Sequence, residues 1–386
     1  MLFLTLGAMR AVAQDTQSTP VPQASAPAPA PPEPRWHYGA FADGAFLYDF
    51  NHPANHLFRD RSTTAYVNEP VLDMAAVYLR KDASGQSRWG MEVTFQAGKD
   101  SLAFGFSPVA PKLPGSRWLR HLGPTDVSYL APVGKGLTIQ GGIFNSFIGY
   151  ESLYAKDNLT YTRSWGADNT PYLMMGINAS YSFNPKWTAA AFIVNDYDHL
   201  ADPNSVPSSG GQVVYKATDH TTLKETVLYG PHQSDTAIGF WRFLSDSIVE
   251  WKTDRFTTAF EYQVGQEKVA SDGEPRALWM ASQLPLHWSP RGPWSFTVRP
   301  EFAWDRNGRW TGDRQFIYAI TNTVQYLLSY GPGKAYFRLE YRYDHSSGPQ
   351  GGFWFGAIQP NGVPQLVPGQ NLLIGAIILT IEGSRL

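Results

Sequence analysis

The feature that most constrains the fold is a two-stranded unit that recurs along almost the whole chain. Its clearest copy is the stretch 171–195. Apolar and polar residues alternate over 176–183, the period-2 pattern of a strand with one apolar and one polar face. Turn-forming residues follow at 184–186, and a second apolar run then covers 187–194. This stretch therefore predicts a tight antiparallel hairpin.

Roughly sixteen strand-like segments of this kind follow one another, and their connections alternate between short and long. The segments are 36–49, 70–81, 87–99, 121–131, 136–147, 171–183, 187–195, 210–217, 220–230, 239–252, 255–266, 276–288, 293–304, 314–330, 334–343 and 370–381. An up-and-down barrel in an outer membrane requires such alternation, because turns on one side are tight while loops on the other can grow. A propeller would instead show four-strand blades at a fixed period, and none is found. The predicted fold class is all-β, a transmembrane up-and-down antiparallel β-barrel of about 16 strands, with short periplasmic turns and long external loops.

The composition agrees with a barrel whose outer surface contacts lipid. Aromatic residues reach 14%, whereas charged residues are only 17%, below the ~25% of soluble domains. The longest apolar run, 372–381, is about half of the ~20 residues that a spanning helix needs. A formal net charge of −2 offers no basic surface for nucleic acid, and the absence of cysteine excludes disulfides and thiolate metal sites.

The N-terminal residues indicate export. Residues 1–13 have a short apolar core and end in an Ala-Val-Ala triplet, the small-x-small pattern of a signal-peptidase site, so a signal peptide is expected there. Residues 14–35 are rich in proline and alanine and cannot bury a core, so a disordered tail or linker is expected. The outer-membrane barrel is then expected over 36–386.

Charged residues share the polar face of several predicted strands, opposite aromatic and aliphatic residues. Because a charge on the lipid face costs ~2–4 kcal/mol at the midplane, these charges are expected to face a wet lumen. Both signs occur in similar number, which predicts weak charge selectivity. The alternative is that they pair with one another and only stiffen the wall. The predicted pore-lining residues are Glu92, Asp126, Arg242, Asp246, Glu250, Glu261, Arg299, Glu301, Arg338, Glu340 and Arg342.

Two positions do not fit the alternation. Glu225 shares parity with apolar neighbours, so either a bulge shifts the register or this position lies near the membrane interface. Pro300 removes a ladder donor inside a predicted strand. A local bulge is the expected explanation for both.

Aromatic residues and long loops give two expectations about the shape of the barrel. Aromatic residues at strand ends are expected to form interfacial girdles. The loops 101–120 and 148–170 carry apolar residues that free external loops rarely expose, so they are the candidates for folding inward and narrowing the pore. An external cap, or packing between loops, is the alternative. The girdle candidates are Trp36, Trp187, Trp251 and Trp294.

The sequence offers little other chemistry. His52 and His56 have a metal-like spacing, but the proline between them prevents the helix that would align them, which favours a loop-stabilising role. Asp196, Asp198 and Asp202 could hold calcium, against the alternative of a solvated turn. Nucleophile-elbow, Walker, Rossmann and zinc-protease motifs are all missing from the sequence. No catalytic residue, metal or cofactor is therefore expected.

Several stretches together resemble the OmpL-like β-barrel porins of Gram-negative bacteria, the β-barrel porin-2 family. YDFNHPANHLFRD at 48–60 is similar to the aromatic-x-F-N-x-P loop of that family, and VLDMAAVYLRK follows where its second strand would lie. The blocks 171–196 and 210–231 resemble its paired hairpins, and FWRFLSDSIVEW resembles its next strand. The resemblance covers roughly 36–386, although the chain ends in IEGSRL rather than in an aromatic residue.

The resemblance implies an outer-membrane channel for passive diffusion of small hydrophilic solutes or ions. It transfers no catalytic residue. The partners it implies are outer-membrane lipid and those solutes; nucleic acid is not expected, and a homo-oligomer stays open. The alternative is a barrel plugged by its loops that acts as a receptor, adhesin or structural protein. An outer-membrane enzyme is the least favoured class.

Overall fold

The computed structural model describes residues 36–103, 116–197, 199–201, 204–232, 239–269 and 275–385, and nearly all of its regular structure is β-strand. The expected signal peptide (1–13) and tail (14–35) lie outside the described residues. No described helix is long and apolar enough to cross a membrane. The strands are β1 Trp36–Asp49, β2 Pro70–Lys81, β3 Trp89–Ala97, β4 Leu122–Ala131, β5 Leu137–Asn145, β6 Leu173–Ser182, β7 Trp187–Val194, β8 Ser208–Lys216, β9 Thr221–Pro231, β10 Trp241–Lys252, β11 Phe256–Glu267, β12 Ala277–Gln283, β13 Leu286–Trp288, β14 Trp294–Asp305, β15 Gln315–Tyr330, β16 Gly333–Ser347, β17 Phe353–Ile358, β18 Pro364–Val367 and β19 Gly369–Arg385. The helical turns are η1 Asp100–Ala103, η2 Ser116–His121, η3 Ala155–Asp157 and α1 Trp165–Asp168.

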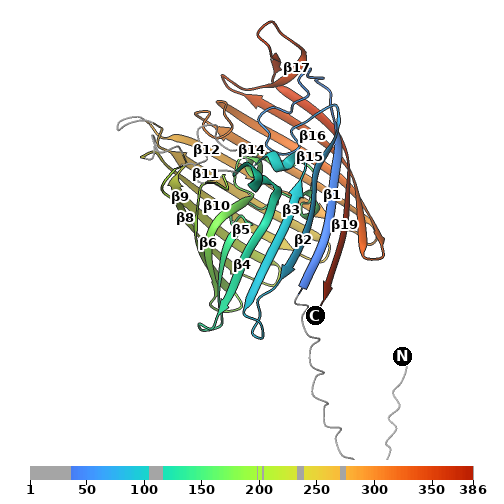
Figure 1. Ribbon diagram of the computed structural model, residues 1–386. Helices are drawn as coiled ribbons and strands as arrows, with labels where there is room; N and C mark the ends of the chain where they lie inside the picture. The colour runs from blue at the N-terminus through green and yellow to red at the C-terminus, as the bar shows by residue number, and fades with distance from the viewer. Residues whose placement is uncertain are drawn as a thin grey trace, which may run out of the picture. The chain divides into compact units, whose positions relative to one another are not determined.

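The long strands form one closed antiparallel barrel (Figure 1). They pair in chain order from β1 to β16, and β19 then pairs with both β16 and β1. Strands β12 and β13 occupy a single position, because both lie between β11 and β14. The described barrel therefore has sixteen strand positions, as the sequence predicts. Closure satisfies the backbone groups that an open sheet would leave at its edges.

Two prolines interrupt the wall where β12 gives way to β13. Pro285 lies in the short gap between these strands, and Pro300 lies opposite in β14. Neither has a backbone N–H group to donate, so the ladder is reduced here to one hydrogen bond, from the Leu284 N–H group to the Pro300 carbonyl oxygen at 3.0 Å, and it resumes in the same register beyond. The expected bulge at Pro300 is wrong, because β14 pairs with β15 residue for residue across this position. Register shifts occur instead in the β1–β2 and β3–β4 pairs.

The wall has an apolar outer face and a polar inner face. On β16, Phe337, Leu339 and Tyr341 are exposed on the outside, whereas the intervening Arg338 and Glu340 are buried inside. Exposed aliphatic and aromatic side chains continue on the other long strands. A belt of this kind matches the lipid-facing surface of an outer-membrane barrel.

Glu225 lies on the outer face. The expected bulge is wrong here too, because β9 pairs with β8 and β10 without a register shift. The side chain is exposed, and its carboxylate accepts hydrogen bonds from the hydroxyl groups of Ser245 (2.6 Å) and Ser247 on β10. The charge is therefore held by neighbouring serines on the outside of the wall.

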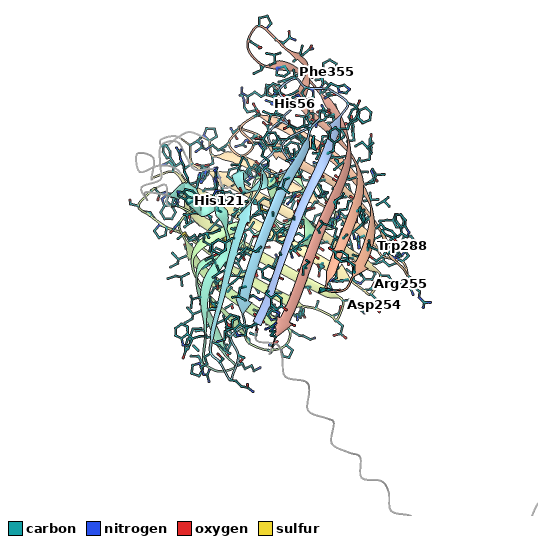
Figure 2. All side chains as sticks on the ribbon, turned by 45° about the vertical axis from the view of Figure 1, so that its right-hand side comes forward. His56, His121, Asp254, Arg255, Trp288 and Phe355 are labelled. Atoms are coloured by element: carbon teal, nitrogen blue, oxygen red, sulfur yellow. The ribbon has the colours of Figure 1, made fainter. Side chains whose placement is uncertain are left out.

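The two ends of the barrel differ in their connections, as predicted. Tight turns join the strands at one end, where β1 begins and β19 ends, and long connections join them at the other (Figure 1). In Figure 2, His56 and Phe355, from two long connections, lie at the upper end, while Asp254 and Arg255, from a tight turn, lie well below them. In outer-membrane barrels the tight-turn end is periplasmic and the long-loop end external.

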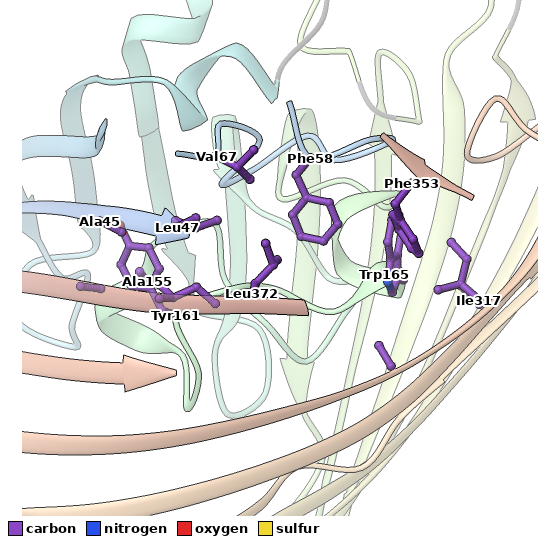
Figure 3. Close-up of a cluster of buried hydrophobic side chains, with 14 of the residues drawn as sticks. Ala45, Leu47, Phe58, Val67, Ala155, Tyr161, Trp165, Ile317, Phe353 and Leu372 are labelled. Carbon is purple, nitrogen blue, oxygen red and sulfur yellow. The ribbon is translucent and has the colours of Figure 1, made fainter. Parts of the chain in front are cut away.

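The interior of the barrel is filled in part by residues 146–172, the connection from β5 to β6, which we call the inner loop. Figure 3 shows its Trp165 beside Phe58 of the β1–β2 connection and Phe353 of β17, with ring centroids 5.8 and 6.2 Å away. Trp165 has no exposed surface. The predicted inward fold of 148–170 is thus confirmed. In the other candidate loop, 101–120, residues 104–115 lie outside the described residues.

Candidate functional site

The inner loop holds its shape through contacts of its own. Ser164 caps α1 by accepting a hydrogen bond from the Ala167 N–H group at 3.1 Å. The Asn158 amide closes a turn by bonding both the N–H and the C=O of Ser152, each at 2.8 Å. These turns use side chains rather than a sheet ladder to shape the backbone. Other backbone groups of the loop therefore stay available to the barrel wall.

Charged residues of β16 bind those backbone groups. The carboxylate of Glu340 accepts the N–H groups of Tyr161 and Thr162 at 2.7 and 3.1 Å. Arg338, on the same inner face, donates to three loop carbonyl oxygens at 2.6–2.9 Å. Those carbonyls belong to Ala155, Asn158 and Thr160. The Glu340 carboxylate thus satisfies backbone N–H groups of the inner loop, and the Arg338 guanidinium satisfies backbone carbonyl oxygens of the same loop.

A second set of anchors lies beside it on β14 and β16. Glu301 accepts the Trp165 N–H group at 2.6 Å and lies 3.0 Å from Arg342. Arg299 pairs with Glu151 of the inner loop at 2.5 Å. These groups are buried, so each charge depends on its partners. Removing one partner of such a pair leaves the other charge buried and uncompensated.

The neighbouring part of the same wall, on β10 and β11, binds the start of the inner loop. Asp246 accepts the Gly149 N–H group at 2.8 Å, and Glu261 accepts that of Tyr150 at 3.0 Å. The inner loop leaves β5 and returns to β6, so it crosses the lumen to reach its anchors on the wall from β10 to β16.

All eleven predicted pore-lining residues lie on the inner face, and seven of them bind the inner loop. Of the other four, Arg242 pairs with Glu267 at 2.7 Å. Glu92 lies opposite Asp126 across β3 and β4, and Glu250 lines a side cavity of 280 Å³. Their contact with a passing solute stays a prediction.

The β1–β2 connection covers the inner loop from the external end. Arg61 pairs with Asp168 at 2.8 Å and lies over the Trp165 ring, 4.9 Å from its centroid. Thr63 donates to the same Asp168 carboxylate at 2.5 Å. At the rim of this connection, burial raises the pKa of Asp60 to about 6, although Arg59 counteracts it. The first external connection and the inner loop therefore form one packed unit.

Two cavities lie on either side of the inner loop. The larger, of 730 Å³, opens among the periplasmic ends of β1 and β19 and is lined by residues such as His37, Glu92 and Lys156. The smaller, of 210 Å³, lies toward the external end and is lined in part by Arg242 and Arg309. Both cavities have Tyr172 in their lining. Tyr172 is 7% exposed, and its hydroxyl group bonds the Asp168 carboxylate at 2.8 Å.

An apolar cluster narrows the lumen at the start of the inner loop. It joins Phe147 and Ile148 of the inner loop to inward side chains of β5–β10, and Phe147 stacks on Phe192 with ring centroids 4.9 Å apart. Below it, toward the periplasmic end, the inner faces of β6 and β7 carry Ser180 and Thr188, which are partly exposed. Apolar contacts therefore narrow the lumen toward the external end, and uncharged polar residues line it toward the periplasmic end.

The four girdle candidates all lie at the tight-turn end. Trp187 and Trp294 begin β7 and β14, Trp251 lies near the end of β10, and Trp36 begins β1. Their exposed fractions are 42%, 49% and 43% for Trp187, Trp294 and Trp251, while Trp36 is half-buried. Trp288, labelled in Figure 2, lies at the same end. An aromatic belt at the membrane interface stays a prediction.

The sequence did not identify the partners within the loops. The sequence predicts no role for three charged residues of the inner loop that form buried ion pairs in the lumen. They are Glu151, Arg163 and Asp168. The sequence does contain a signal for these pairs: the loop is expected to fold inward, and charged residues that become buried with it need oppositely charged or hydrogen-bonding partners. His52 and His56 bond to Tyr48 and to a backbone oxygen in their own connection, in line with a loop-stabilising role.

Comparison with solved structures gives the same fold. The anion-selective porin from Comamonas acidovorans matches with a TM-score of 0.57 and 11% identity, over 90% of this chain and 100% of that one. Salmonella typhi OmpF in complex with daunomycin matches with 0.56 and 8%, over 91% and 98%. The outer membrane channel DcaP of Acinetobacter baumannii matches with 0.55 and 8%, over 90% and 96%. A search of curated proteins gives no match.

A closed sixteen-position barrel with an apolar belt and a loop folded into its lumen defines the class of outer-membrane β-barrel proteins. The family model described as "Putative beta-barrel porin-2, OmpL-like" matches residues 36–381, and the chain belongs to this family. Family and fold thus agree on a porin-type β-barrel of the outer membrane.

Proposed function

We propose that the protein is a passive channel for small hydrophilic solutes or ions, with its narrowest point at Tyr172. The observation that carries this proposal is that a periplasmic and an external cavity share this side chain across the inner loop. The charges that could bind a solute tightly are instead occupied by the inner loop. A wide, weakly selective lower lumen and one narrow throat follow from this arrangement.

The test is single-channel conductance of the refolded protein in a planar bilayer, comparing wild type with Tyr172→Ala. Wild type is expected to give discrete, salt-dependent steps, and Tyr172→Ala at least about twofold larger ones, since pore width governs flux. Tyr172→Phe keeps the ring and is expected to conduct like wild type. Tyr341→Ala, on the outer face, is the control for a lost tyrosine. Equal conductance of wild type and Tyr172→Ala would place the throat elsewhere.

The second candidate function is a plugged barrel that serves as a receptor, adhesin or structural protein. The packed unit of inner loop, β1–β2 connection and apolar cluster favours it, because these elements leave little open lumen at the external end. A folded protein without steps, in wild type and in Tyr172→Ala alike, would support this alternative over the channel.

We also propose that residues 1–13 are cleaved as a signal peptide on export. The support is the apolar core and the Ala-Val-Ala triplet before Gln14. N-terminal sequencing of protein isolated from outer membranes is expected to begin at Gln14, and an intact Met1 would contradict cleavage.

We also propose a homo-oligomer whose interface covers the outer face of β8–β10. The outward position of Glu225 supports it. A carboxylate that faces lipid in mid-strand is costly, and the small outward residues Ser245 and Ser247 beside it, with Gly211 one pair further along β8, would let a second wall approach closely. OmpT of Vibrio cholerae, a protein of the same fold, has been solved in a trimer form. Glu225→Leu is expected to weaken the oligomer in chemical crosslinking of outer membranes. A more stable barrel with unchanged crosslinking would show that Glu225 faces lipid.

A further inference from the structure

One group of side chains outside the lumen site brings three metal-binding residues together in the described part of the chain. Asp196 and His199 belong to the connection between β7 and β8, and His232 directly follows β9. Their potential ligand atoms all lie within 4.8 Å of one another. Both rings turn Nδ1 toward the Asp196 carboxylate, with Nδ1 of His232 3.2 Å from each of its oxygens.

The scaffold around these residues is packed. Asp196 is 2% exposed, and Leu200 in the same connection has no exposed surface. The side-chain amide of Asn195 bonds the Leu200 carbonyl at 2.8 Å, and that of Asn204 bonds the Pro231 carbonyl at 3.3 Å. The second of these contacts ties the β7–β8 connection to the residue that precedes His232. Ligands on a packed scaffold need little ordering when an ion binds.

The two imidazole rings are stacked, with centroids 5.4 Å apart and planes 17° from parallel. Two protonated rings in this arrangement would repel each other beside a single carboxylate. Two neutral rings and one carboxylate are instead the ligand set that a divalent transition metal accepts, because imidazole nitrogen and carboxylate oxygen both suit zinc. The arrangement therefore fits one shared cation better than two separate ion pairs.

We propose that Asp196, His199 and His232 bind a divalent transition-metal ion of the zinc class. In a tetrahedral zinc site, ligands about 2.0–2.1 Å from the metal lie about 3.3 Å from one another. The 3.2 Å between His232 Nδ1 and the Asp196 oxygens already matches that spacing. Three protein ligands leave the fourth position for water or a solute. The side chains of His199 and His232 keep 16% of their surface exposed, which gives the ion a way in.

The site would clamp two external connections at the channel mouth. His232 lines the external cavity, and its ring contacts Tyr197, which lies under the guanidinium of Arg242 at 4.6 Å. Arg242, which pairs with Glu267, lines the same cavity. A bound ion would therefore stiffen the rim through which a solute enters. The binding proposal itself does not rest on the channel function.

Zinc titration of the refolded full chain in detergent, by calorimetry and by elemental analysis after dialysis, tests the site. Wild type is expected to bind one Zn²⁺ per chain and to unfold at a higher temperature with ZnCl₂ than with a chelator. Asp196→Asn and His232→Ala are expected to lose both effects. His232→Gln removes the imidazole while retaining a polar side chain, and it is expected to lose binding as well. The folded state of each variant is checked by heat-modifiable migration.

His37→Ala is the matched control. His37 also pairs with an aspartate, Asp82, at 2.8 Å, but at the periplasmic end and beside Arg80 rather than a second histidine. This variant is expected to bind zinc like wild type. Equal binding by all variants would assign the metal to an adventitious surface site. Absence of binding by wild type would show that the three residues only form hydrogen bonds with one another and do not bind a metal. Stabilisation by CaCl₂ but not by ZnCl₂ would also overturn the proposal.

Discussion

Two regions of the inner wall use polar residues in opposite ways. The charged inward residues of β14 and β16 are at most 7% exposed, because the inner loop lies against them. Across the lumen, the inner faces of β6 and β7 carry Asn178, Ser180 and Thr188, which have no charge. The charged wall has become part of a protein core, whereas on the uncharged wall Asn178 is buried but Ser180 and Thr188 stay partly exposed to the lower lumen.

The difference shows that a charge inside a barrel need not face water. A buried carboxylate or guanidinium is tolerated only when its hydrogen bonds are complete, and the backbone of a folded-in loop can complete them. Glu340 and Arg338 do this with donors and acceptors of the inner loop. The charged residues that bind the inner loop therefore determine the shape of the pore, whereas the uncharged residues of β6 and β7 form its lining.

The largest effect is expected where the loop-bound wall loses an anchor. Glu340→Ala removes the acceptor of two loop N–H groups and leaves Arg338 without a neighbouring carboxylate on its strand. Losing one partner of a buried network costs about 3–5 kcal/mol. We expect the unfolding midpoint in urea to fall accordingly and the channel to become noisy as the inner loop detaches.

Ser180→Ala on the open wall is the control, with an expected change within about 0.5 kcal/mol. Glu340→Gln keeps an acceptor oxygen and is expected to recover part of the loss. Similar destabilisation by Glu340→Ala and Ser180→Ala would break the contrast between the two walls.

A smaller effect, on selectivity rather than stability, is expected from a charge on the open wall. Ala190 lies on the inner face of β7 and is partly exposed, next to Ser180 and Gln212 on the neighbouring strands. Ala190→Asp should shift the reversal potential in a salt gradient toward cations, and Ala190→Lys toward anions, by up to several-fold in permeability ratio.

The next residue, Ala191, provides the control. It lies on the outer face and is exposed, so Ala191→Asp places the charge toward lipid. That variant is expected to lower the folding yield in lipid vesicles and to leave selectivity unchanged. A selectivity shift from Ala191→Asp, or none from Ala190→Asp, would contradict the assignment of the two faces.

The strands could be predicted from sequence because alternation and turn residues are local signals. The sixteen positions, the tight turns such as 253–255 and the inward direction of the charges all follow from parity within one strand. Glu225 and Pro300 could not be explained this way. The serines that hold Glu225 lie on another strand, and the gap opposite Pro300 depends on Pro285 in the adjacent one.

The site was predictable only in part, for a related reason. Parity gives the side to which Glu340 points, but its partners Tyr161 and Thr162 are 179 and 178 residues away in the sequence. The same holds for Asp196 and His232, 36 residues apart. A single sequence contains no local pattern for such pairings, because they follow from barrel closure and from how a long loop is folded.

A third effect, on the pH dependence of stability, is expected at the external rim, where a carboxyl group is only partly compensated. Asp60 accepts a hydrogen bond from Gln315 at 2.6 Å but lies 3.8 Å from Arg59, which pairs with Asp313 instead. Because burial raises the pKa of Asp60 to about 6, its stabilising contribution is present below its ordinary pKa near 3.8 and is lost as the pH rises through 6. The loss should be at most about 3 kcal/mol.

Unfolding midpoints between pH 4 and pH 8 test this expectation. Wild type should lose stability across pH 4–6 relative to Asp60→Asn, which keeps an acceptor for Gln315 but carries no charge at any pH. Asp254→Asn, in an exposed tight turn at the other end, should follow the wild-type profile. If Asp60→Asn were instead less stable than wild type above pH 6, the Asp60 charge would be well compensated, and the rim would behave like the loop-bound wall.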